Sequence, residues 1–151
     1  MDMRTLPVAL ALAAVTCTAP LLAADSRRDG VTEKTLAAIA ALDARGEKIA
    51  DRYLKDRVAG EPVACLPHAR MRRSAAASDD VLLYDSGSVV YVNSPDLGCP
   101  RARNNALISV SPIPRLCSGD IIQVQDPLAG VPIASCTLNE FVPFRKMKKG
   151  G

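Results

Sequence analysis

The stretch VLLYDSGSVVYVN, residues 81–93, gives the clearest indication of fold in this sequence. Two runs rich in β-branched and aromatic side chains, 81–84 and 88–93, flank the turn-forming triplet at 85–87. Such runs favour β-strands, and a short glycine-containing connection between them is typical of a β-hairpin. The sequence therefore predicts an antiparallel hairpin near the middle of the chain.

Similar short runs lie on both sides of this hairpin, and each ends at a turn signal such as the Ser-Asp-Asp triplet at 78–80. Strands at regular spacing, with no helix between them, indicate an antiparallel sheet or small barrel rather than β-α-β units. The further predicted strands are residues 63–66, 69–76, 106–111, 120–125 and 134–142.

A helix is predicted before the strands, over residues 32–57, which are rich in Ala, Leu, Glu and Lys. Its larger apolar residues fall near one face, and Gly46 weakens the middle and could divide it into two helices. The predicted fold is thus α+β and mainly β: an N-terminal helix followed by a small disulfide-braced antiparallel sheet or barrel. We expect a linker at 25–31, one domain at 32–144 and a disordered basic tail at 145–151.

Residues 1–24 have the layout of a secretory signal peptide: Arg4, an uncharged run rich in Ala, Leu and Val, and the small pair Ala23-Ala24. The alternatives are a retained membrane anchor and a lipid-modified Cys17. Cleavage predicts a periplasmic or secreted protein with no membrane span in the mature chain.

Four cysteines remain after the leader: Cys65, Cys99, Cys117 and Cys136. An even number in an exported chain indicates disulfides, but four cysteines allow three pairings. We favour Cys65–Cys136, joining the first and last strands, and Cys99–Cys117, closing the loop between them.

Two rival hypotheses involve these cysteines. Zinc sites usually contain closely spaced pairs of ligands, and the gaps here are much longer, so no metal and no cofactor are predicted. A catalytic thiol needs a base, and His68 is the single histidine. A small hydrolase or thiol-redox protein using Cys117 or His68 is therefore the alternative function.

Charge gives one candidate binding site. The net charge of +3 is too small to indicate a nucleic-acid partner. Arg70, Arg72 and Arg73 cluster on a predicted strand, where they could bind an anionic ligand or form a solvated edge. Alternation along a strand would place Arg70 and Arg72 on one face and Arg73 on the other.

Other polar residues favour structural roles. Asp79, Asp80 and Asp120 lie at turns, where Asp commonly accepts hydrogen bonds from the local backbone. Tyr91 and Asn93 share a strand face and could line a pocket, or could pack in the core and enter a turn. No nucleotide-binding, serine-hydrolase or zinc-protease motif occurs. The leading hypothesis is a non-catalytic binding or envelope-accessory module, with an envelope component or an anionic ligand as partner, although enzymatic activity stays open.

Several segments, taken in order, resemble the DUF6491-type family of small exported bacterial proteins of unknown function. Two departures from the family pattern are Asn139, in place of a frequent Gly, and the Ala-rich run 75–78. The resemblance implies an exported domain of the same fold and implies no activity. The segments that carry it are AGEPVACLP (59–67), DDVLLY (79–84), VVYVNSP (89–95), LCSGDII (116–122) and LNEFVPF (138–144).

Overall fold

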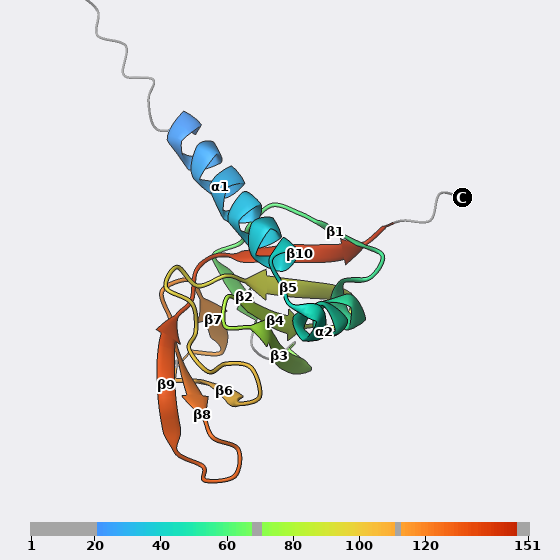
Figure 1. Ribbon diagram of the computed structural model, residues 1–151. Helices are drawn as coiled ribbons and strands as arrows, with labels where there is room; N and C mark the ends of the chain where they lie inside the picture. Colours follow the sequence, from blue (N-terminus) through green and yellow to red (C-terminus); the bar gives the residue numbers. More distant parts are fainter. Residues whose placement is uncertain (1–20, 68–70, 111–112, 148–151) are drawn as a thin grey trace, which may run out of the picture.

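The computed structural model describes residues 21–67, 71–110 and 113–147, and its chain forms two helices followed by strands (Figure 1). The predicted α+β, β-rich class is confirmed. The helices are α1 (Leu21–Ala40) and α2 (Ala44–Leu54). The strands are β1 (Arg57–Ala59), β2 (Cys65–Pro67), β3 (Arg73–Ser78), β4 (Val81–Asp85), β5 (Val89–Asn93), β6 (Ala106–Ser109), β7 (Arg115–Cys117), β8 (Ile121–Gln125), β9 (Pro132–Thr137) and β10 (Phe141–Lys146).

The predicted hairpin is confirmed and lies within the largest sheet. This sheet has five strands in the order β1-β10-β5-β4-β3, and every neighbouring pair is antiparallel. The last strand, β10, lies between the first strand, β1, and β5, so the two ends of the strand-forming chain meet in one sheet. Within the hairpin, Tyr84 on β4 lies opposite Tyr91 on β5.

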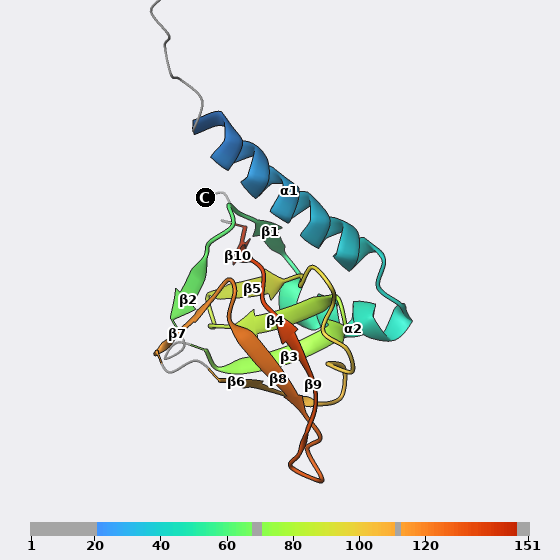
Figure 2. The ribbon, with the colours of Figure 1, turned by 90° about the vertical axis from the view of Figure 1, so that its left-hand side faces the viewer.

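Two smaller sheets complete the β structure. Strands β2 and β7 pair with each other, and β6, β8 and β9 form a three-stranded sheet with β8 in the centre. An isolated bridge between Val63 and Phe141 connects the segment before β2 to the large sheet. In Figure 2, α1 crosses one side of the large sheet, and β8 and β9 lie on the other.

Two apolar layers, one on each face of the large sheet, form the core. Leu82 and Tyr84 pack with residues of the smaller sheets, whereas Val81 and Leu83 pack with residues of the helices. Alternation sends successive side chains of a strand to opposite faces, so β4 is buried along its whole length. The hairpin sequence is therefore the centre of a three-layer arrangement.

The helical boundaries differ from the prediction. Residues 25–31, predicted as a linker, belong to α1, because Ser, Arg and Asp are all compatible with a helix and Gly30 lies in open space. The break between the helices lies at 41–43 rather than at Gly46. The Asp43 side chain accepts a hydrogen bond from the Gly46 N–H at 2.7 Å and so begins α2.

Several strand boundaries also need correction. The predicted strand 134–142 is two strands, because Leu138 donates its N–H to the Asp120 carbonyl and the chain then passes to the large sheet. The predicted strand 69–76 is shifted to 73–78. The short strands β1 and β7 were not predicted, since three residues give too little periodicity. Arg145 and Lys146, predicted to lie in a disordered tail, pair with β1; residues 148–151 lie outside the described part.

Candidate ligand pocket at Tyr84

The cysteine pairing differs from the one we favoured. The bridges are Cys65–Cys117 and Cys99–Cys136. Strands β2 and β7 are adjacent, and their register places Cys65 directly opposite Cys117. In this bridged form Cys117 has no free thiol. The alternative function, a hydrolase or thiol-redox protein using Cys117 or His68, stays a prediction. His68 lies outside the described residues.

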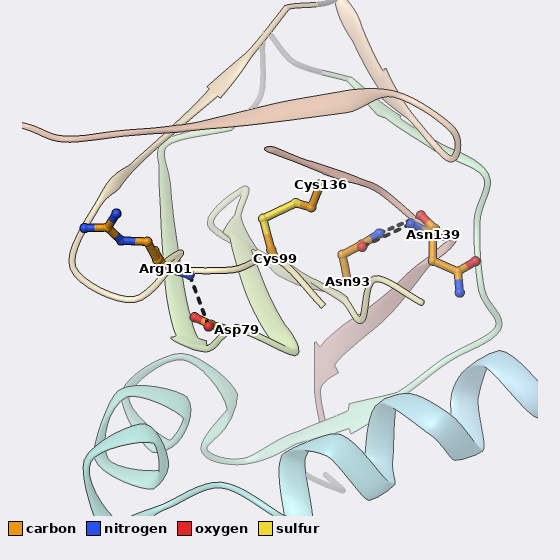
Figure 3. Close-up of a disulfide and its surroundings, with 6 residues drawn as sticks. All are labelled: Asp79, Asn93, Cys99, Arg101, Cys136 and Asn139. Atoms are coloured by element: carbon orange, nitrogen blue, oxygen red, sulfur yellow. Dashed lines mark hydrogen bonds between the residues drawn. A yellow bond between two sulfur atoms is a disulfide. The ribbon is translucent and has the colours of Figure 1, made fainter. Parts of the chain in front are cut away.

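The Cys99–Cys136 bridge joins the loop after β5 to β9 within the core (Figure 3). Asp79 holds the same loop, since its side chain accepts from the Arg101 N–H at 3.1 Å and its carbonyl accepts from the Cys99 N–H at 2.6 Å. Asp79 lies in the turn between β3 and β4, as predicted, but its side chain accepts from a distant loop rather than from the backbone of its own turn.

Asn93 and Asp120 also have structural roles. Buried Asn93 donates to the Asn139 carbonyl at 2.6 Å and accepts from the Asn139 N–H at 3.2 Å, which ties β5 to the segment before β10 (Figure 3). Asp120 accepts from the Cys117 N–H at 2.7 Å and closes the turn between β7 and β8. These contacts account for the hydrogen bonding of both side chains and assign them no chemistry.

A cavity of about 280 Å³ lies between the large sheet and the smaller ones. Its walls come from the start of β3, from β4 and from β6, β7 and β8, so all three sheets contribute. Strands β3 and β6 are sheet-edge strands, and they lie close together in Figure 2. The lining residues are Met71, Arg72, Arg73, Ser74, Tyr84, Leu107, Ser109, Leu116 and Ile122.

Tyr84 is one of the polar residues that line this pocket. Its side chain is 2 % exposed, and its hydroxyl has no hydrogen-bond partner within the described structure. The ring packs edge-to-face on Phe141, with the ring centroids 5.7 Å apart. Burial raises the pKa of the Tyr84 phenol, so the group is neutral and able to donate a hydrogen bond. A buried hydroxyl without a partner costs roughly 1–3 kcal/mol. Thr35 and Ser94 also have buried hydroxyls without a partner among the described residues, but only that of Tyr84 belongs to a residue lining this pocket.

The structure places two of the three predicted anion-binding arginines at the pocket. Arg73 forms an ion pair with Asp85 at 3.4 Å, and its side chain is largely exposed. The Arg72 guanidinium lies against Gly87, and among the described residues it makes no side-chain hydrogen bond or ion pair. Arg70 lies outside the described residues.

Sequence reasoning did not identify Tyr84, Leu107, Leu116 or Ile122 as pocket residues. Each lies on a strand with an apolar pattern, and such a pattern indicates burial without distinguishing a cavity wall from a filled core. The one available signal was a polar-tipped Tyr in an otherwise aliphatic run, since a buried Tyr usually finds a partner for its hydroxyl.

The described residues form other pockets as well. A larger groove, about 900 Å³, lies between α1 and residues 59–62. Another pocket, about 440 Å³, lies beside the Cys99–Cys136 bridge. Across residues 21–67, 71–110 and 113–147, no group of three acidic, cysteine or histidine side chains could hold a metal ion. No helix in these ranges is both long and apolar enough to cross a membrane.

Comparison of the chain with protein-family models, curated proteins and solved structures found no match.

Proposed function

We propose that the protein is an exported, non-catalytic binding module and that the Tyr84 pocket is its binding site. The observation that carries the proposal is the buried Tyr84 hydroxyl, which lacks a partner beside a cavity of about 280 Å³. A bound acceptor would provide the hydrogen bond that the described residues do not, after a movement that opens the buried oxygen to the cavity. Small-molecule sites typically combine apolar walls with a few polar groups that orient the ligand, and this pocket has that composition.

Export is supported by the signal-like leader and by two disulfides, which persist in oxidising compartments. The resemblance to the DUF6491-type family stays a prediction and names no ligand. An envelope component is one source of such a ligand.

Protein-observed NMR with methyl-labelled Leu and Ile tests the site. We expect at least one ligand from a panel of small acids, alcohols and amines to cause saturable shifts at Leu107, Leu116 and Ile122. Tyr84→Phe should weaken that ligand about five- to tenfold, the size of one hydrogen bond. The matched control is Tyr91→Phe, because Tyr91 lies opposite Tyr84 on β5 and is not part of the pocket wall.

The stability of the same variant gives an independent check. Because the Tyr84 hydroxyl has no partner among the described residues, Tyr84→Phe should leave the free energy of unfolding unchanged or raise it by about 1 kcal/mol. Absence of any saturable shift at the pocket methyls, or a loss of stability above about 2 kcal/mol in Tyr84→Phe, would contradict the proposal.

A further inference from the structure

We infer that the pocket binds a small organic anion, a monocarboxylate with a short apolar body, and that Arg72 contacts its carboxylate. This inference rests on the proposed function, because it names the chemistry of the ligand for the same pocket.

The strand register places the polar groups together. Ser74 on β3 lies directly opposite Tyr84 on β4, and directly opposite residues project from the same face of a sheet. Arg72 lies just before β3 and lines the same cavity. Its N–H donates to the Asp85 carbonyl at 2.7 Å, one position out of register with the pairing of Arg73 and Asp85. The lining of the cavity, which includes Arg72, Ser74 and Tyr84, therefore places these polar side chains at one pocket.

The two arginines at the pocket differ in availability. Arg73 already has the Asp85 carboxylate as its partner. Arg72 has no such partner for its side chain within the described residues, and its backbone N–H is held by the Asp85 carbonyl. The guanidinium that is available to bind a new carboxylate is therefore that of Arg72. A guanidinium binds a carboxylate with two parallel hydrogen bonds.

The remaining walls determine the rest of the ligand. Leu107, Leu116 and Ile122 present aliphatic surface, which favours an apolar body. A volume of about 280 Å³ is below the usual range for drug-sized ligands, so the body must be short. The neutral Tyr84 phenol donates a hydrogen bond, and a carboxylate has enough lone pairs to accept from both Tyr84 and Arg72. A divalent metal or an ammonium compound lacks these acceptors.

The test compares hexanoate with hexan-1-ol, which share an apolar chain and differ in charge. Methyl shifts at Leu107, Leu116 and Ile122 report binding to the oxidised, full-length protein. We expect hexanoate to bind at least tenfold more tightly than hexan-1-ol. Arg72→Met keeps an unbranched apolar stem. It should lower the affinity for hexanoate about tenfold and leave the affinity for hexan-1-ol unchanged.

Arg73→Met is the matched control, because Arg73 is adjacent, exposed and already paired. We expect it to change hexanoate affinity by at most about twofold, an effect that salt would screen. Both substitutions are at exposed positions, and an unchanged methyl spectrum without ligand verifies the fold.

The possible outcomes separate the two proposals. Equal affinity for hexanoate and hexan-1-ol, or an unaffected Arg72→Met variant, would overturn the anion assignment and leave the pocket as a binding site. Binding of inorganic phosphate as tight as that of hexanoate would overturn the requirement for an apolar body. Failure of every ligand to shift the pocket methyls would overturn both the inference and the proposed site.

Discussion

At the scale of single residues, close backbone approach and local hydrogen bonds determine where the chain turns and packs. Gly46 shows this most directly. It was expected to interrupt a helix, but it is buried in α2, where a Cβ would lie 2.7 Å from the Ala77 carbonyl oxygen on β3. The glycine is therefore the contact point between the second helix and the edge of the large sheet.

Gly46→Ala should lower the free energy of unfolding by about 1–3 kcal/mol, because overpacking against backbone outweighs the better helix propensity of Ala. Urea denaturation measures this difference. Gly30→Ala is the matched control in α1, where nothing lies within 4 Å, and it should raise stability by about 0.5–1 kcal/mol. A stabilised Gly46→Ala variant would show that α2 can move away from β3.

Asp43 connects stability to pH. Its hydrogen bond to Arg103, at 2.7 Å, and then its contact with the Gly46 N–H hold the pKa of Asp43 below the ordinary value of 3.8. A lowered pKa in the folded state adds stability that is present above pH 3.8 and is lost as the pH falls through the folded value.

Asp43→Asn keeps an N-cap acceptor and removes the charge. We therefore expect a shallower fall in stability below about pH 4 than in the wild type, measured by urea denaturation across the acid range. The double variant with Arg103→Gln should behave like the single one, because one ion pair is lost in both. If the stability of Asp43→Asn fell with acid pH just as that of the wild type does, the charge of Asp43 would make no contribution to stability.

At the scale of elements, the two disulfides differ in their surroundings. Cys65–Cys117 joins the paired strands β2 and β7, and both of its residues are half-buried. Cys99 and Cys136 are 0 % and 8 % exposed and belong to the core. Accessibility to a reducing agent therefore distinguishes a bridge within a small outer sheet from one inside the packed layers.

Graded reduction of the native protein should open Cys65–Cys117 first, because thiol–disulfide exchange requires access to a sulfur atom. Alkylation at each step followed by peptide mass spectrometry identifies the cysteines released. In denaturant both bridges should open together, since the difference in burial is then gone. Early labelling of Cys99 or Cys136 in the native protein would contradict the assignment.

At the scale of the whole molecule, α1 covers one face of the large sheet. Its contacts with the core begin at Val31 and include the half-buried residues Ala38 and Ile39. The expected cleavage point after Ala24 lies within the helix but before these contacts. Removal of a leader would therefore shorten α1 without uncovering the sheet.

A chain that starts at Asp25 should have a melting temperature within about 2 °C of that of the full-length chain. A chain that starts at Ala41 should lose about 2–4 kcal/mol, because the apolar sheet face under α1 becomes exposed. Thermal unfolding followed by circular dichroism compares them. Equal stability of all three chains would show that α1 does not contribute to the core.

The amino-acid sequence by itself determined those parts of the structure that depend only on residues close together in the chain. The hairpin at 81–93 and the turn at Asp79 follow from short-range backbone preferences and periodicity, which the amino-acid sequence contains directly. The strands are likewise recognisable from their own composition, and this is why the fold class could be predicted correctly.

The tertiary structure alone decided the cysteine pairing and the pocket. Cys65 meets Cys117 because β2 pairs with β7, and Tyr84 meets Leu107 and Ile122 because two sheets pack face to face. These contacts join residues far apart in the chain, and many arrangements of the strands would satisfy the same local preferences. The packing that buries the most apolar surface selects among them, and that selection is a property of the whole chain.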